Sequence, residues 1–96
     1  RIDWHKSAAQ IYNLIRGVTH PYPGAFTSLD GKKVIIWKAW PMEGSGEPGQ
    51  VISVNPLQVG TGNGLLEIRE LQVESEEETT ADYFVEKRML ATAKFA

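Results

Sequence analysis

AFTSLDGKKVIIWKAW, residues 25–40, consists of two runs of strand-forming residues joined by the dipeptide Asp30-Gly31. Asp-Gly supplies the two positive φ angles that a two-residue type I′ turn requires. The stretch therefore predicts a β-hairpin with strands over residues 25–29 and 32–40, and Pro41 is predicted to end the second strand.

Three further strands are predicted after a loop of glycine, serine, glutamate and proline. Two short apolar runs over residues 51–54 and 57–61 are separated by the turn-initiating pair Asn55-Pro56. Gly62-Asn63-Gly64 then turns the chain into a longer strand over residues 65–73.

The longest of these strands changes phase in its middle. Leu66 and Ile68 share one face, but the next apolar residues, Leu71 and Val73, are one position out of step. A bulge at Arg69-Glu70 would return both to the core face and would bend the strand as a barrel requires.

A helix is predicted on each side of the strands. Ser7-Ala8-Ala9-Gln10 has the spacing of a capping box, and apolar residues at helical spacing continue this helix to about Gly17 or Val18. After the acidic run of residues 74–78, Thr79-Thr80-Ala81-Asp82 offers a second N-cap. The helix that follows is marked by Ala81, Phe84, Val85 and Met89.

These elements predict a single domain over residues 1–96 that is mainly β with flanking helices. A small antiparallel sheet hides its edges best by curling into a barrel with a helix across an opening. We therefore expect an OB-like (oligonucleotide/oligosaccharide-binding) small antiparallel barrel with an N-terminal helix and a C-terminal helix.

Composition narrows the class of protein. The 12 acidic residues outnumber the 10 basic ones, so the domain as a whole does not attract polyanions. The chain has no cysteine, which fits a reducing compartment, and a cytoplasmic location is expected. The longest apolar run, residues 34–37, is far shorter than the roughly 20 residues of a membrane span, so no membrane partner is expected. The chain opens on Arg1 rather than methionine, and we expect it to be a piece of a longer protein.

Residues that carry chemistry are scarce. The two histidines, His5 and His20, lack the spacing of a zinc pair, so no metal site is predicted. No serine lies on a glycine-flanked elbow, and the glycine-rich stretch 60–64 lacks the lysine and the following helix of a phosphate loop. The glutamates of residues 74–78 are interpreted as a solvated connection. No catalytic residue is predicted.

Trp37 and Trp40 lie three positions apart on one predicted strand, so they are expected to point to opposite faces, one in the core and one partly exposed. An exposed aromatic side chain on a small barrel can stack on bases. The alternative is that it packs under the first helix or against a neighbouring domain.

Asn13 and Arg16 share a face of the first helix. Two roles are open for Arg16. It contacts a ligand, or it caps carbonyl groups at the end of the helix and in the turn that follows.

Four motifs follow one another along the chain: Ile2-Asp3-Trp4; the helix with Ala8, Ile11, Asn13 and Arg16; Pro21-Tyr22-Pro23-Gly24-Ala25-Phe26-Thr27; and Gly-x-Gly before a strand that ends Glu70-Leu71-Gln72. Together they resemble the C-terminal domain of the folate-dependent formyltransferases. That family includes methionyl-tRNA formyltransferase and the sugar-nucleotide formyltransferases. The resemblance covers about Ile2 to Met89, and in this family the corresponding domain is OB-like.

The resemblance implies a parent reaction, the transfer of a formyl group from 10-formyltetrahydrofolate to a primary amine. The family's catalytic asparagine, histidine and aspartate belong to a Rossmann-like N-terminal domain, and no residue of this sequence matches them. This chain alone is therefore expected to be inactive and to hold no cofactor, with its own catalytic N-terminal domain as a partner.

Pro21, Pro23 and Gly24 predict a stiff corner after the first helix. Pro23-Gly24 fits the central positions of a type II turn, and Pro21 fixes the approach. We expect the corner to help bound the acceptor site, with the substrate-binding residues Asn13, Arg16, Tyr22, Pro23 and Gly24. The alternative is that it only seats the helix against the barrel and the interdomain surface.

Two candidates for the acceptor remain open, an initiator tRNA and a nucleotide-linked amino sugar. Lys32, Lys33 and Lys38 cluster on the hairpin and are candidates for contact with phosphate or nucleic acid, as an initiator tRNA would require. The excess of acidic residues, and the similarity of residues 47–57 to the sugar-nucleotide members, favour a nucleotide-linked amino sugar. A third hypothesis is a stand-alone OB-type module that binds nucleic acid or protein, and the absent initiator methionine argues against it.

Overall fold

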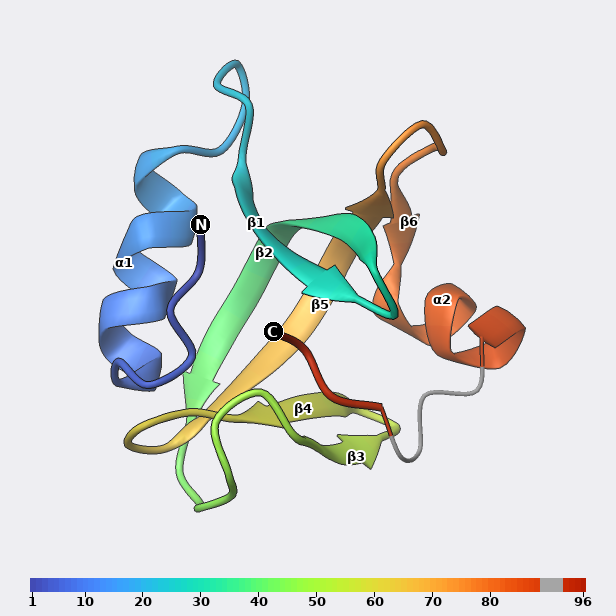
Figure 1. Cartoon of the computed structure of the whole chain (residues 1–96). Helices are drawn as coiled ribbons and strands as arrows, with labels where there is room; N and C mark the ends of the chain where they lie inside the picture. Colours follow the sequence, from blue (N-terminus) through green and yellow to red (C-terminus); the bar gives the residue numbers. More distant parts are fainter. Residues whose placement is uncertain (89–92) are drawn as a thin grey trace.

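The computed structural model describes residues 1–88 and 93–96 as an antiparallel sheet of six strands with a helix near each end of the chain (Figure 1). This confirms a mainly β fold with flanking helices. Met89, predicted in the second helix, lies outside the described residues. The elements in chain order are α1 (Ala8–Gly17), β1 (Ala25–Leu29), β2 (Lys32–Met42), β3 (Val51–Val54), β4 (Leu57–Gly60), β5 (Leu65–Val73), β6 (Thr79–Thr80) and α2 (Ala81–Arg88).

The hairpin of β1 and β2 forms as predicted, because Asp30 and Gly31 take φ angles of 51° and 78° in its turn. The prediction that Pro41 ends the second strand is wrong, since Pro41 pairs with Leu66 inside β2. The pairing of β1 with β2 stops at Ile36, so the rest of β2 has a sheet neighbour on one side only. A proline is tolerated at such an edge.

The strands follow the order β1-β2-β5-β4-β3, and β6 pairs with β5. Between β2 and β5 the register passes from Ile36↔Leu71 through Lys38↔Glu70 to Ala39↔Ile68. One extra residue is therefore accommodated in each strand, Arg69 in β5 as predicted and Trp37 in β2, which was not predicted. The bulges keep the apolar residues of both strands on the core face, and β5 buries Leu66, Ile68, Leu71 and Val73.

The sheet is open between β1 and β3, and the C-terminal residues lie in this gap. Phe95 donates its amide to the Gly49 carbonyl beside β3, while Ala96 and Ser28 of β1 exchange both backbone hydrogen bonds. The Phe95 side chain is 1% exposed. In Figure 1 the C-terminus accordingly lies between β1 and the β3–β4 hairpin. The short tail thus makes the fold barrel-like although the strands themselves do not close.

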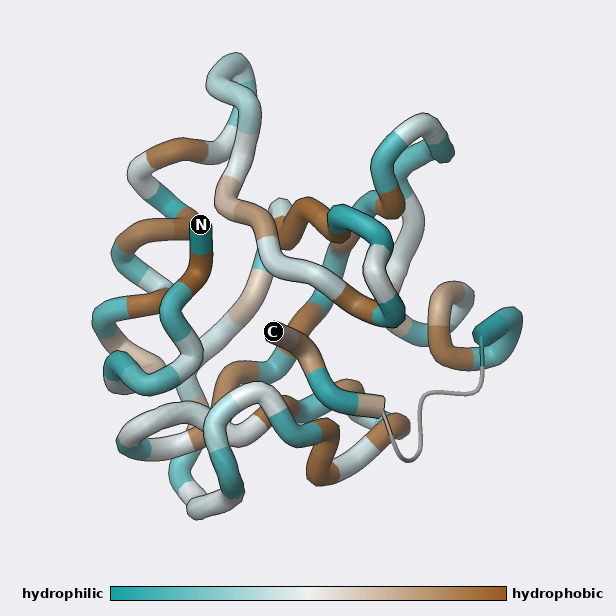
Figure 2. Tube along the Cα trace, viewed as in Figure 1, coloured by the Kyte–Doolittle hydropathy of each residue, from teal (hydrophilic) through white to brown (hydrophobic). Residues whose placement is uncertain are grey.

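The N-terminal segment runs beside β1 and leads into α1. The capping box at Ser7 and Gln10 is present in both directions, as predicted. Apolar residues of α1 and of every longer strand supply the core, whereas the hairpin tip and the loop after β5 are hydrophilic (Figure 2). No helix within the described ranges is long and apolar enough to cross a membrane.

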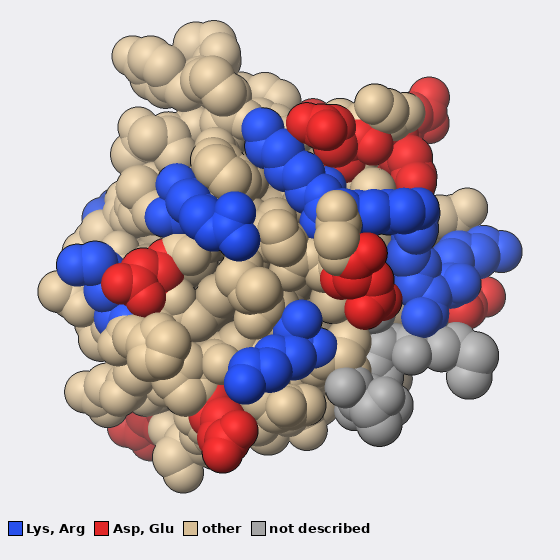
Figure 3. Space-filling view, in the orientation of Figure 1, with Lys and Arg blue, Asp and Glu red and all other residues tan. Residues whose placement is uncertain are grey.

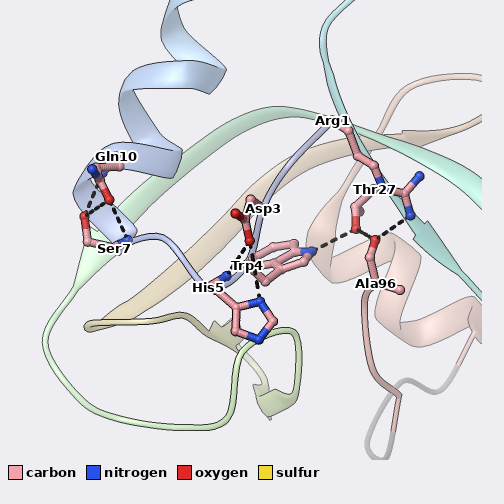
Figure 4. A network of polar contacts seen from close by, with 8 residues as sticks. All are labelled: Arg1, Asp3, Trp4, His5, Ser7, Gln10, Thr27 and Ala96. Atoms are coloured by element: carbon pink, nitrogen blue, oxygen red, sulfur yellow. Dashed lines mark hydrogen bonds and ion pairs between the residues drawn. The ribbon is translucent and has the colours of Figure 1, made fainter.

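Thr27 of β1 joins the two ends of the chain to the sheet (Figure 4). Its side chain is fully buried, accepts from Trp4 Nε1 at 2.8 Å and donates to Ala96 O at 2.7 Å. One hydroxyl therefore satisfies a buried indole N–H and an oxygen of the closing tail.

Thr27→Val keeps the shape of the side chain and removes both hydrogen bonds. Because the indole N–H would remain buried without a partner, we expect the free energy of unfolding, measured by urea denaturation, to fall by about 2 kcal/mol. Thr19→Val, at a half-exposed position outside the sheet, is the matched control. A loss no larger than that of the control would contradict the role assigned to Thr27.

Candidate functional site

A pocket of about 340 Å³ lies between α1 and β2 and is called the α1–β2 groove here. It brings together two of the residues predicted to contact ligand, Arg16 and Lys38. Aromatic side chains form much of the remaining wall. The lining residues that matter for its chemistry are Tyr12, Arg16, His20, Trp37, Lys38 and Trp40.

The helix is anchored in the core by Ile11 and Ile15, and it presents Tyr12 and Arg16 to the groove. Tyr12 and Arg16 lie one turn apart, and the Arg16 guanidinium carbon is 4.8 Å from the centre of the Tyr12 ring. Arg16 also donates to Asn13 Oδ1 at 2.9 Å. The side chain of Arg16 is therefore held over the groove by a cation–π contact and a hydrogen bond. This hydrogen bond uses one of the several N–H donors of the guanidinium.

The two tryptophans of β2 line the same groove, so the prediction that they point to opposite faces is wrong. The physical reason is the bulge at Trp37, which interrupts the two-residue alternation of the strand. The predicted difference in exposure is confirmed, since Trp37 is 9% exposed and Trp40 is 40% exposed. The ring of Trp40 lies 5.7 Å from that of Tyr12, at an interplanar angle of 34°.

Trp37 is covered by the proline-rich segment that follows α1. The His20 ring stacks on it with a centroid distance of 3.8 Å and an interplanar angle of 11°. Trp37 Nε1 donates to Gln72 Oε1 at 2.8 Å. His20, which sequence analysis did not select as a site residue, is thus the side chain that closes this end of the groove.

The corner after α1 differs from the predicted turn. Its backbone hydrogen bond runs from the Tyr22 amide to the Thr19 carbonyl, so the hydrogen-bonded turn lies before Pro23 and Gly24 rather than on them. Gly24 does take the positive φ expected of it, at 91°. A Cβ there would lie 2.5 Å from Cγ2 of Ile35 and 2.9 Å from the Trp37 ring. Glycine is required because the corner is pressed against β2.

The predicted substrate-binding residues therefore divide into three groups. Arg16 lines the groove, and Asn13 accepts a hydrogen bond from the Arg16 side chain. Gly24 packs behind the groove against Trp37. Tyr22 is 61% exposed, Pro23 is also exposed, and neither lines the groove.

The acidic loop between β5 and β6 is exposed, as predicted for a solvated connection, but two of its glutamates also contact other elements. Glu78 Oε2 lies 2.8 Å from His20 Nε2, and both carboxylate oxygens of Glu76 accept from one nitrogen, Nη2, of Arg88 in α2, at 2.6 and 2.7 Å. Its partners come from elements far away in sequence, which explains why the charge run alone gave no sign of these contacts. Such exposed pairs contribute little stability individually, but together they fix the position of the loop.

The three lysines of the hairpin do not form one cluster. Lys33 lies over the Phe26 ring and 3.7 Å from Glu74, whereas Lys38 lines the α1–β2 groove. Lys32 lines a separate pocket together with Lys87 and Arg88 of α2. Lys32 and Lys38 are six positions apart along the strand, a distance of about 20 Å. Figure 3 shows the basic side chains that gather over the hairpin tip and α2.

Nothing in the described part of the chain indicates a metal centre, since no three histidine, aspartate or glutamate side chains there are placed to share an ion. Asp3 and His5 form a local contact instead. The Asp3 carboxylate accepts the His5 amide at 3.0 Å and lies 3.5 Å from Nδ1 of the same residue (Figure 4).

The chain is similar to known proteins in sequence and in fold. The family model described as formyl transferase, C-terminal domain, matches residues 1–88. Two solved structures of HypX from Aquifex aeolicus are similar. A variant with alanine substitutions has a TM-score of 0.73 and 22% identity, over 96% of this chain and 17% of that chain. The complex with tetrahydrofolic acid has a TM-score of 0.70 and 24% identity, over 88% of this chain and 16% of that chain. These similarities show a shared fold, and the chain spans less than a fifth of the HypX chains.

The close approach at Gly24 gives a prediction for the corner. Gly24→Ala should lower the free energy of unfolding by about 1–3 kcal/mol, because the methyl group meets Ile35 and Trp37 and the φ angle is unfavourable for alanine. Gly17→Ala, at a helical position where a Cβ meets nothing within 4 Å, should raise it by about 0.5–1 kcal/mol. Urea denaturation of both variants measures these changes in the free energy of unfolding. A change of the same sign and size in both variants would contradict the packing assigned to Gly24.

Proposed function

Because the chain belongs to the formyl transferase C-terminal domain family, we propose that it is the non-catalytic C-terminal domain of a 10-formyltetrahydrofolate-dependent formyltransferase. In this role it helps to position the amine acceptor beside a catalytic N-terminal domain. The family match over residues 1–88 is the observation that carries the proposal. The complex of HypX with tetrahydrofolic acid supports folate as the cofactor of the parent enzyme. The absence of cysteine is in keeping with a cytoplasmic enzyme.

The geometry around α1 supports a positioning role. Arg16 is oriented by Tyr12 and Asn13 before any ligand arrives. The adjoining corner is fixed by the stacking of His20 on Trp37 and by the close packing of Gly24. A cation that is already oriented loses little conformational entropy on binding an anionic group.

A nucleotide-linked amino sugar is the acceptor that this site favours. The groove is small, and its cationic side chains are Arg16 and Lys38. Two cations can contact the two phosphates of one diphosphate, beside the carboxylates of Glu70 and Glu78 that also line the groove, and the net charge of −2 does not favour a polyanion.

Arg16→Ala in the full-length enzyme should raise the KM for the acceptor about tenfold, because a charge-assisted contact to the substrate is lost while the reacting groups stay in place. Steady-state kinetics with saturating formyl donor measures this. Lys6→Ala, an exposed cation ahead of α1, is the control and should leave the KM unchanged. An unchanged acceptor KM in a normally folded Arg16 variant would remove the ligand role of Arg16.

A tRNA acceptor is the second candidate, and the pocket shared by Lys32, Lys87 and Arg88 is the observation that favours it. Arg88 is paired with Glu76, so Lys32 and Lys87 are the cations there that outweigh the one lining carboxylate, Asp30. A nucleic-acid partner would use this pocket for phosphate groups.

Titration of the chain with initiator tRNA at low and moderate salt separates the two acceptors. For a sugar-nucleotide enzyme we expect no micromolar binding at either salt concentration. Micromolar affinity with a steep salt dependence, lost in Lys32→Ala, would instead establish phosphate contacts and the tRNA acceptor.

A further inference from the structure

We propose that the α1–β2 groove binds the nucleoside diphosphate part of the acceptor, with the base stacked on Trp40 and the phosphates at Arg16 and Lys38. This inference rests on the proposed function and adds to it a ligand class and a location. It is carried by the exposure of Trp40, by the rigidity of the surface beneath it and by the unpaired cations on either side.

Trp40 is an unusual side chain to leave in solvent. The other two tryptophans of this small domain are at least nine-tenths buried, whereas Trp40 is 40% exposed and contacts the Tyr12 ring. An exposed indole flanked by a second aromatic ring offers a planar surface for a base, and such stacking tolerates any base because each has a π face.

The surface beneath Trp40 is rigid. Trp40 stands opposite Glu67 in the pairing of β2 with β5, and Glu67 is only 5% exposed. The Glu67 carboxylate is satisfied by Arg69 at 2.6 Å and by Gln58 Nε2 at 3.1 Å. A buried carboxylate is tolerated only with such partners, and its network fixes the strand surface on which the indole lies.

The cations beside Trp40 are available to an anion. Within the described residues neither Arg16 nor Lys38 has a carboxylate at ion-pair distance, whereas Lys33, Arg69 and Arg88 are each paired. Two acids also line the groove. Glu78 is engaged by His20, and Glu70, which stands opposite Lys38 in the strand pairing, is the single carboxylate there without such a contact.

The size of the groove suits a mononucleotide. Its volume of about 340 Å³ lies at the lower end of the range for small-molecule pockets. A base stacked on the exposed face of Trp40 would place its phosphates toward the two cations, which lie on opposite walls, Arg16 on the helix and Lys38 on β2.

Isothermal titration calorimetry of the 96-residue chain with uridine diphosphate tests the proposal. We expect saturable binding that Trp40→Ala and Lys38→Ala each weaken about tenfold, and that Trp40→Phe largely keeps because a ring remains. Tyr83→Ala is the matched control, since Tyr83 is 55% exposed beside Lys87 on α2, and it should change the affinity less than about twofold. Circular dichroism of each variant establishes that it is folded.

Three results would overturn the proposal. These are the absence of saturable binding up to about 5 mM uridine diphosphate, an equal loss in Trp40→Ala and Tyr83→Ala, and tighter Trp40-dependent binding of 5-formyltetrahydrofolate than of the nucleotide. Failure here is distinct from failure of the proposed function. A raised acceptor KM in full-length Arg16→Ala, without nucleotide binding to this chain, would keep the positioning role and reject the nucleotide site alone.

Discussion

The hydroxyl of Thr27 joins the N-terminal segment, the sheet and the C-terminal tail at a single buried point. A domain of this length hides only about 60 to 65% of the surface of its unfolded chain, so its strands alone do not enclose a sufficient core. Trp4 and Phe95, whose ring centres are 5.7 Å apart, fill the gap that β1 and β3 leave open. Thr27 satisfies polar side-chain and main-chain atoms that this closure buries, and it adds to the backbone hydrogen bonds by which Ile2 and Ala96 are joined to β1.

The bulge at Trp37 is the second constraint, because it connects the bend of the sheet to the shape of the groove. It places Trp37 and Trp40 in the wall of one pocket while Ile36 and Ala39 remain in the core. The segment after α1 then covers Trp37 through His20 and leaves Trp40 accessible. The binding surface is therefore a consequence of the irregularity that lets β2 follow the barrel.

Patterns of residues close together in sequence predicted most of the helices, strands and turns. The Asp30-Gly31 turn, the capping box at Ser7 and the bulge at Arg69 each depend on residues close together in sequence, and each is present. The bulge at Trp37 was missed because the run from Val34 to Trp37 is apolar throughout and shows no change of phase. The role of Phe95 was missed because the gap that it fills exists only once the whole sheet is assembled.

The candidate site was harder to predict because its charges are paired across the fold. The lysines of the hairpin looked like one basic group, but Glu74 engages Lys33, and about 20 Å of strand separates Lys32 from Lys38. What remains is two small cationic positions in separate pockets rather than one continuous basic face. Binding a nucleic-acid backbone requires many phosphates to be neutralised together, since each contributes its own share of counterion release. Two isolated positions, each with two or three cations, satisfy a small anionic ligand more readily than a polyanion, and only the one beside Trp40 combines its cations with an accessible indole.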